Sequence, residues 1–268
     1  MKIWRTFYTS FFEHRLLENA SSLSFYTLLS IVPILAVLFG IAKGFGIDAL
    51  LEREVINAVP NQEALAEQVI QFSRKMLEQS RGGLIAGAGI LMLLWSFLGL
   101  LANFEKALND IWNVKEGRSY SRRLGDFLGF IFLFPFILVA ISSTILFVST
   151  ELIDFFQSRG IIEPYGPYLS LTFQLFPLGI TFLVFNFFYL YLPNTSVPLR
   201  SSFLASLVAT VGFHLAQWVF VKFQVGISNY GAVYGSFAAI PLFLLWLQMS
   251  WLITLLGGEL AYQFTKKK

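Results

Sequence analysis

Cysteine is absent from the chain and charge is scarce. The 268 residues include only two histidines, and Asp, Glu, Lys and Arg together make up 13% of the sequence, which is about half the share in a typical soluble domain. The absence of thiols excludes disulfides, thiolate metal sites and cysteine nucleophiles. The scarcity of charge excludes an ordinary water-soluble surface, because a soluble domain of this size needs more charged side chains to cover it.

Recognisable catalytic motifs are also missing. The sequence contains no HExxH, P-loop, GxSxG or Cys–His metal set. Its histidines, His14 and His214, lie far apart along the chain, and its acidic residues form no set that is typical of metal or acid–base catalysis. The sequence therefore predicts a protein that is not an enzyme and that holds no metal or other cofactor.

Hydrophobic residues dominate what is present. They make up 56% of the chain and include 30 phenylalanines, and six apolar segments are each long enough to cross a bilayer, which takes about 20 residues of helix. These segments predict an all-α fold, a polytopic membrane helix bundle that forms a single transmembrane domain over residues 1–268. The predicted transmembrane helices are Leu23–Ile47, Leu84–Asn103, Leu124–Ile153, Tyr168–Leu192, Leu199–Phe223 and Phe237–Phe264.

Two segments outside the spans are predicted to lie at the inner surface. Residues 1–18 mix aromatic and basic side chains, which predicts an amphipathic interfacial helix rather than a cleavable signal peptide. Residues 104–123 are predicted to form a cytoplasmic loop in which the second helix continues until Gly117 breaks it. The apolar side of that continuation is expected to consist of Phe104, Leu108, Ile111 and Trp112.

The longest connection, residues 48–83, is predicted to lie on the outer side. It reads as two amphipathic helices broken at Pro60. The helical spacing of its second half predicts an apolar face that consists of Leu65, Val69, Phe72 and Met76.

Lys and Arg are concentrated at one set of segment ends. If the N-terminus lies inside, these residues favour the cytoplasmic side by about two to one, as the positive-inside rule expects for an even number of spans. Both termini are therefore predicted to be cytoplasmic. The same rule accounts for the net charge of +3 and the pI near 9.1, so nucleic acid is not predicted as a partner.

Proline interrupts four of the six predicted spans. Pro33, Pro135, Pro177 and Pro241 lie in the first, third, fourth and sixth spans and are predicted to kink them. The other two spans carry stripes of small residues, which let helices approach closely. The shared order suggests a 3+3 inverted repeat, as in many secondary transporters, although proline and glycine are frequent in membrane helices anyway. In the fifth span the stripe consists of Ser201, Ser202, Ala205, Ser206, Ala209 and Thr210.

Polar side chains at membrane depth form a candidate path. They can line a route for a substrate or for protons, or they can form only helix-to-helix hydrogen bonds that contribute about 0.6 kcal/mol each. Ser30 is also expected to help satisfy the backbone carbonyl that Pro33 frees. The candidate path residues are Ser24, Thr27, Ser30, Asn186, His214, Gln217 and Gln248.

Charged side chains gather at the predicted inner ends of the spans. They indicate either an ion-paired gate or cation site, or interfacial pairing that only fixes the helix ends. Glu259 follows Gly257 and Gly258, where helix backbones are expected to come close. The candidate cytoplasmic gate residues are Glu18, Glu105, Asp126, Glu259, Arg122 and Arg123.

Several stretches resemble a known family. They include SSLSFYTLLS at 21–30, LPNT at 192–195, YGSFAAIPL at 234–242 and LLGGEL at 255–260. Over nearly its whole length the chain resembles the YihY/virulence factor BrkB family of bacterial inner-membrane proteins. This resemblance implies a multi-span protein of the plasma membrane with no established catalytic residues. It also implies a link to envelope integrity and lipid handling.

Three functions follow as hypotheses. The first is transport or handling of a lipid or amphiphilic envelope component, with membrane lipid as the partner. The second is a non-transporting scaffold that recruits an envelope protein through the outer segment, residues 48–83. The third, a ribonuclease, rests only on an old family label, ribonuclease BN, and the residues give it no support. The substrate, its direction, any coupling ion and the oligomeric state stay open.

Overall fold

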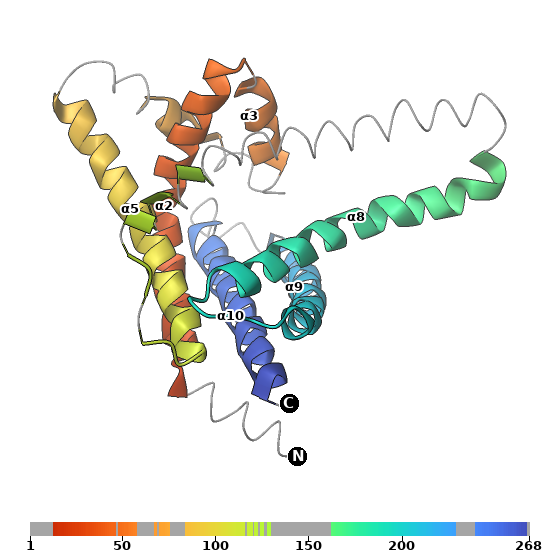
Figure 1. Cartoon of the computed structure of the whole chain (residues 1–268). Coiled ribbons are helices and arrows are strands. Elements are labelled where there is room, and N and C mark those ends of the chain that lie inside the picture. Colours follow the sequence, from red (N-terminus) through yellow and green to blue (C-terminus); the bar gives the residue numbers. More distant parts are fainter. Residues whose placement is uncertain are drawn as a thin grey trace. The chain divides into compact units, whose positions relative to one another are not determined.

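The fold is helical wherever the structure describes it (Figure 1). The computed structural model describes residues 13–46, 48–57, 67–75 except 69, 84–129 except 116, 120, 123, 126 and 127, 162–228 and 239–266. Helices are the only regular elements in these residues, which confirms the all-α class. They are α2 (Leu16–Gly44), α3 (Asp48–Asn57), α5 (Leu84–Ile111), α8 (Ile162–Tyr191), α9 (Leu199–Ser228) and α10 (Ala239–Lys266).

Five of the predicted spans coincide with long helices, namely α2, α5, α8, α9 and α10. The predicted third span, Leu124–Ile153, lies almost entirely outside the described residues. Among those described, Leu199–Phe223 and Pro241–Lys266 are long and apolar enough to cross a membrane, and Leu175–Tyr191 is a shorter apolar helix. The count of six spans and the inverted repeat stay predictions.

The chain divides into two compact units. Unit 1 consists of Met1–Leu28, Gly99–Tyr120 and Phe176–Lys268, and unit 2 consists of Leu29–Leu98 and Ser121–Leu175. The helices α2, α5 and α8 each pass from one unit into the other.

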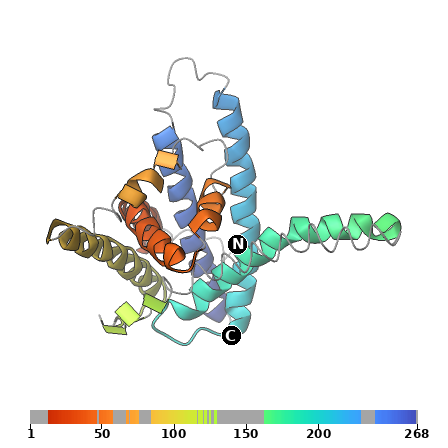
Figure 2. The ribbon, with the colours of Figure 1, turned by 90° about the horizontal axis from the view of Figure 1, so that it is seen from above.

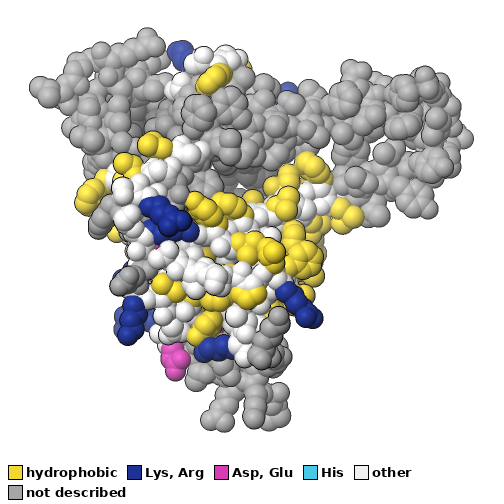
Figure 3. All heavy atoms as spheres, viewed as in Figure 1, with side chains coloured by type: hydrophobic (Ala, Val, Ile, Leu, Met, Phe, Trp, Pro, Cys, Tyr) yellow, Lys and Arg dark blue, Asp and Glu magenta, His cyan; other side chains and the backbone are white. Residues whose placement is uncertain are grey.

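In unit 1, α9 has two faces of opposite character. Its buried face carries the predicted stripe of small residues, all of which are buried. Its opposite face carries large apolar side chains that are exposed, and Figure 3 shows hydrophobic side chains gathered where α8 and α9 lie. A helix in water would bury the second face and expose the first. The exposed apolar side chains of α9 include Phe203, Leu207, Val211, Leu215 and Trp218.

Helices α9 and α10 of unit 1 lie side by side in opposite directions (Figures 1 and 2). A Cβ atom placed on Gly257 would lie 2.8 Å from the Cβ of Ala209, and one placed on Gly212 would lie 3.9 Å from Cγ2 of Ile253. Residue numbers increase along α9, from 209 to 212, while those of the contacting residues on α10 decrease, from 257 to 253, so the two helices are antiparallel. The N-terminus of α9 and the C-terminus of α10 therefore share one end of unit 1.

Gly257 and Gly258 of α10 allow side chains of α8 and α5 to pack directly against the backbone of α10. A Cβ on Gly257 would overlap the ring of Tyr189 from α8, with Cζ at 2.7 Å, and a Cβ on Gly258 would lie 2.7 Å from Cδ2 of Leu108 from α5. Tyr189 is fully buried there, and its hydroxyl donates to the carbonyl oxygen of Thr254 at 2.9 Å. The expected close approach at Gly257 and Gly258 is confirmed.

The second helix ends earlier than predicted. Helix α5 stops at Ile111, because Asn113 adopts a left-handed conformation with φ of 54°. The amide of Val114 donates to the carbonyl of Asn109 at 2.8 Å, and that of Asn113 donates to the carbonyl of Asp110 at 3.2 Å. This is a Schellman C-cap, a motif that asparagine tolerates. The prediction that Gly117 ends the helix was therefore wrong. The predicted apolar side is buried at Phe104, Leu108 and Ile111, and its fourth member, Trp112, is partly buried.

Unit 2 has a conventional apolar core. Leu38, Phe39 and Ala42 of α2 are buried against Ile70 of the outer segment, and partly buried side chains of α3 pack beside them. The helix α3 ends before Pro60, at Asn57. The predicted apolar face of the outer segment was wrong at Phe72, which is 57% exposed, because Ile70 takes the buried position. The other predicted members of that face, Leu65, Val69 and Met76, lie outside the described residues.

The prolines lie in different settings. Pro177 is exposed within α8, and the hydroxyl of Thr181 donates to its carbonyl oxygen at 2.8 Å. Pro241 is the third residue of α10, and the carbonyl that its missing N–H would face, four residues earlier, lies outside the described residues. Pro33 lies within α2, but its side chain lies outside the described residues, as does all of Pro135.

Candidate functional site

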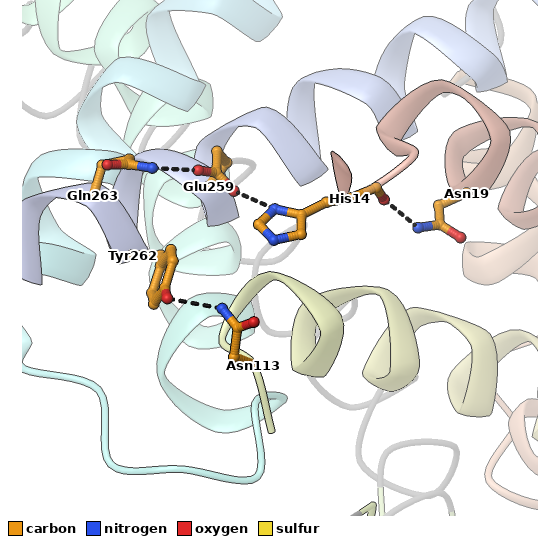
Figure 4. A network of polar contacts seen from close by, with 6 residues as sticks. All are labelled: His14, Asn19, Asn113, Glu259, Tyr262 and Gln263. Atoms are coloured by element: carbon orange, nitrogen blue, oxygen red, sulfur yellow. Dashed lines mark hydrogen bonds and ion pairs between the residues drawn. The ribbon is translucent and has the colours of Figure 1, made fainter. Parts of the chain in front are cut away.

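A buried carboxylate on α10 forms the centre of the candidate site (Figure 4). The side chain of Glu259 is 0% exposed, although it lies in the penultimate turns of a helix that ends at Lys266. Its Oε2 lies 2.9 Å from Nδ1 of His14, and its Oε1 accepts a hydrogen bond of 2.7 Å from Nε2 of Gln263. A charged group that is removed from water needs such partners.

The turn before α2 places His14 against α10. Arg15 has a φ of 48°, a left-handed conformation that forms the turn before α2 begins at Leu16. Asn19 secures the turn: its side-chain Nδ2 donates to the carbonyl of His14 at 3.0 Å, and its backbone amide donates to the carbonyl of Arg15 at 2.9 Å. The imidazole therefore reaches Glu259 across 245 residues of sequence.

The carboxylate raises the pKa of His14 above its usual value of 6.5. The hydrogen bond to Glu259 is the largest cause. Partial burial opposes it by lowering the pKa, and the negative charges of Glu259, Glu13 and Asp110 add to the increase. The pair therefore favours the imidazolium form of His14, with the positive charge next to a carboxylate.

A second buried carboxylate, Glu105, organises the loops at the end of α5. Its Oε1 accepts hydrogen bonds from the backbone amide of Arg118 at 2.7 Å and from Nδ2 of Asn109 at 3.4 Å. The Oδ1 of Asn109 accepts in turn from the amide of Asn194 at 2.8 Å. The guanidinium of Arg118 donates to the carbonyl of Tyr191 and lies 4.6 Å from the centre of its ring. This cluster ties the segment after α5 to the segment after α8.

Those predicted gate residues that the structure describes do not form one cluster. Glu259 and Glu105 are buried with different partners, whereas Glu18 is 68% exposed and pairs with Arg15 at 3.4 Å. Arg122 is exposed. Asp126 and Arg123 lie outside the described residues.

Two predicted path residues connect α2 to α10. Nε1 of Trp251 donates to the hydroxyl of Thr27 at 2.9 Å, and Nε2 of Gln248 donates to the hydroxyl of Ser21 at 2.9 Å. Ser24 instead donates within its own helix, to the carbonyl of Ala20 at 2.8 Å. These contacts are helix-to-helix and local hydrogen bonds.

Two more path residues connect α8 to α9. The hydroxyl of Ser202 donates to Oδ1 of Asn186 at 2.7 Å, and Nε2 of His214 lies 3.2 Å from the hydroxyl oxygen of Thr181. Gln217 is exposed on α9.

Ser30, the remaining path residue, belongs to unit 2 and does not behave as expected. Its buried hydroxyl has no hydrogen-bond partner among the described residues, so the expectation that it satisfies the carbonyl freed by Pro33 was wrong.

Several residues of the site escaped the sequence analysis. His14 was noted only as an interfacial residue, and Tyr189, Asn109 and Gln263 were not singled out. The identity of their partners depends on contacts between distant helices, which no local pattern encodes. One signal was available: Glu259 directly follows a glycine pair on an apolar helix, where a charge needs a partner. Within the described part of the chain, no group of three or more His, Cys, Asp or Glu side chains is arranged to hold a metal ion.

The chain is similar to a family of membrane proteins. Residues 7–268 match the model of the family described as virulence factor BrkB. A UPF0761 membrane protein of Ralstonia nicotianae is 34% identical over 93% of this chain and 55% of its own length, and one of Nitrosospira multiformis is 33% identical over 94% and 58%. A third, of Azotobacter vinelandii, is 30% identical over 97% and 62%.

The chain thus spans somewhat more than half the length of these relatives. Their names describe membrane proteins and specify no reaction. No solved structure matches the chain. The family match over almost all of its residues, together with its apolar helices, shows that the chain belongs to the virulence factor BrkB family of membrane proteins.

Proposed function

We propose that the chain is a multi-pass protein of the bacterial inner membrane that transports or handles a lipid or another amphiphilic component of the envelope. The observation that carries this proposal is the two-faced helix α9, which exposes large apolar side chains and buries small and hydroxyl side chains. Such an arrangement suits contact with acyl chains on one side and close helix packing on the other.

Polar groups lie directly behind this apolar surface. The Asn186–Ser202 and His214–Thr181 pairs join α8 to α9, and the predicted spans would put them at membrane depth. An amphiphile needs an apolar surface for its chains and polar groups for its head, and α8 and α9 carry both. The kinked spans of the sequence pattern would form the path, with six spans as two inverted halves.

The charge pattern supports an orientation with both termini in the cytoplasm. Arg200 at the start of α9 is exposed, as is Lys266 at the end of α10, and the antiparallel packing of the two helices puts both residues at one end of unit 1. The positive-inside rule assigns that end to the cytoplasm. Glu259 lies near the same end and is the best candidate for a gate.

Lipid movement in vesicles tests this proposal. Purified protein would be reconstituted with a fluorescent phospholipid, and a membrane-impermeant quencher would measure exchange between leaflets. Replacing both Asn186 and His214 by Leu removes two polar groups that the head would contact. If each group lowers the barrier to exchange by about 0.6 kcal/mol, as much as a typical polar contact between membrane helices, exchange should slow about eightfold. Val208→Leu, at an exposed position on α9 outside the candidate path, is the control and should leave the rate unchanged. The proposal fails if the unmodified protein does not accelerate exchange.

A scaffold function is the second candidate, because the outer part of unit 2 exposes aromatic side chains. Phe45 and Phe72 are both more than half exposed, and exposed aromatic residues are common in protein interfaces. In this case Phe72→Ser should abolish crosslinking to an envelope protein and leave lipid exchange unaffected. Lipid transport predicts no such loss.

A further inference from the structure

His14 and Glu259 are two titratable side chains in direct contact, and their contact connects the turn before α2 to α10. His14 lies at the turn formed by residues 13–15, and Glu259 lies on α10. Nδ1 of His14 is 2.9 Å from Oε2 of Glu259, which leaves Nε2 of the imidazole as the second site for a proton. The side chain of His14 is 15% exposed and that of Glu259 is 0% exposed. The histidine can therefore exchange a proton with water while the carboxylate remains shielded.

The surroundings of the pair favour a bound proton. Three carboxylates act on the imidazole: Glu259 from α10, Glu13 from the turn itself and Asp110 from the last turn of α5. The nearest basic residue in sequence, Arg15, is well exposed and pairs with Glu18. Without the proton, the two side chains of the pair carry a net charge of −1 in a place shielded from water, which favours taking up a proton. With the proton, the buried charges of the pair sum to zero.

We propose that the His14–Glu259 pair is a proton-binding site, and that uptake of one proton by His14 docks the turn of residues 13–15 onto α10. One proton adds to the neutral imidazole to form imidazolium, and its release restores the neutral ring. The proton would then be the coupling ion of lipid handling, and this assignment rests on the proposed function. Proton binding and docking of the turn do not depend on it.

The direction of the pH effect follows from the geometry. Docking favours the protonated form of His14, so its pKa is raised in the docked state. Stabilisation of the docked state is fully present below the ordinary histidine pKa of 6.5 and is lost as the pH rises through the raised value. A rise in cytoplasmic pH therefore undocks the turn.

Histidine NMR tests the proton site directly. Because the chain has only two histidines, selective isotope labelling of histidine gives two sets of ring signals, and His214→Asn assigns them. His14 should titrate above 6.5 in the unmodified protein in nanodiscs. Glu259→Gln should lower its pKa, because burial then opposes the charge with less compensation. Glu18→Gln, at an exposed carboxylate of the same turn region, should leave the titration of His14 nearly unchanged.

Cysteine labelling tests the docking step. Because the chain has no cysteine, Leu16→Cys and Leu17→Cys each introduce a unique thiol next to the turn. Leu16 is fully buried, whereas Leu17 is 49% exposed. Each thiol would be reacted with a water-soluble maleimide, and the rate for Leu16→Cys would be divided by the rate for Leu17→Cys. This division cancels the ordinary effect of pH on the thiolate content of a cysteine. This ratio should rise severalfold as the pH passes the pKa of His14, and in Glu259→Gln it should be high at every pH.

The two measurements decide the proposal without reference to lipid movement. A His14 pKa that does not respond to Glu259→Gln overturns the proton site, and a flat ratio of labelling rates overturns the docking step. If Leu16→Cys fails to fold, the amide exchange of residues 16–19 at each pH, corrected for its intrinsic rate, replaces the labelling. If both measurements succeed but vesicles show no lipid exchange at any pH, the proton site holds and the proposed lipid function falls.

Discussion

The cores of the two units consist of different types of residue. In unit 2, ordinary large apolar side chains fill the core: Leu38 and Phe39 of α2 pack on Ile70 of the outer segment. In unit 1, the core around Tyr189 combines aromatic rings with alanines and with glycines that leave no room for a Cβ. The buried polar groups of that unit include serines, two threonines and two carboxylates.

The difference reflects the surroundings of each helix. The outer segment is amphipathic, so removing its apolar side chains from water supplies the driving force for packing. A helix such as α9 is apolar on its exposed face as well, and in lipid it gains nothing from burying more apolar surface. Its packing relies on close contact at small residues and on hydrogen bonds. The two cores should therefore respond to opposite kinds of substitution.

Adding volume should do the most damage in unit 1. Gly257→Ala places a methyl group against the ring of Tyr189 and the Cβ of Ala209. It should destabilise the protein by about 3 kcal/mol or more, at the upper end of the range for overpacking, because the rigid ring and the neighbouring helix cannot move aside. Unfolding by a denaturing detergent would measure this. The control is Gly179→Ala, where nothing lies within 4 Å of the added Cβ. An equal loss in both variants would refute the close-packing account.

In unit 2, deleting buried side-chain volume should lower the stability more than adding volume. Ile70→Ala should lower the free energy of unfolding by at least about 2 kcal/mol, the low end for deletion of a buried isoleucine side chain. Phe72→Ala removes a larger side chain from an exposed position two residues away and should have little effect. The same detergent titration applies. A greater loss at Phe72 than at Ile70 would mean that the outer segment is buried by a different face.

A smaller effect is expected at the hydroxyl of Tyr189. Tyr189→Phe removes one buried hydrogen bond to the carbonyl of Thr254 and should cost about 1 kcal/mol. It should also reduce the penalty of Gly257→Ala, because the missing oxygen is the atom nearest to the added methyl group. A double-mutant cycle measures this coupling. Strictly additive losses would argue against the contact between α8 and α10.

The smallest effect should come from a single polar pair. Ser202→Ala removes the hydrogen bond to Asn186 and is expected to cost about 0.6 kcal/mol, the average for such bonds in a membrane protein. A loss of several kcal/mol would show that the pair organises more of α8 and α9 than one contact. Thermal unfolding in detergent is sensitive enough to separate the two cases.

Much of the helical layout could be predicted from sequence. Long apolar runs indicated α2, α5, α8, α9 and α10, since no other regular structure satisfies the backbone of such runs in lipid. The stripe of small residues indicated the buried face of α9, and Gly257 and Gly258 indicated a close approach. These features repeat at helical spacing or depend on neighbouring residues, so a single segment is enough to reveal them.

The partners of the polar residues could not be predicted in the same way. Glu259 was expected among a group of inner charges, but its partner is His14, whereas Glu18 pairs with Arg15 in the adjacent turn. The end of α5 at Ile111 was missed because its left-handed cap residue is Asn113, whereas glycine is commoner at such a position and Gly117 is nearby. Both errors arose where two residue types compete for one role and only the surrounding contacts select between them.

The sequence by itself determined that the chain is helical and which of its segments form long apolar helices, because the solvation of apolar side chains and backbone groups acts on each segment separately. Only the tertiary structure decided that a histidine before α2 meets a buried glutamate on α10, and that Tyr189 lies against Gly257. Those contacts join residues far apart in sequence, and their energy depends on distances that no single segment contains.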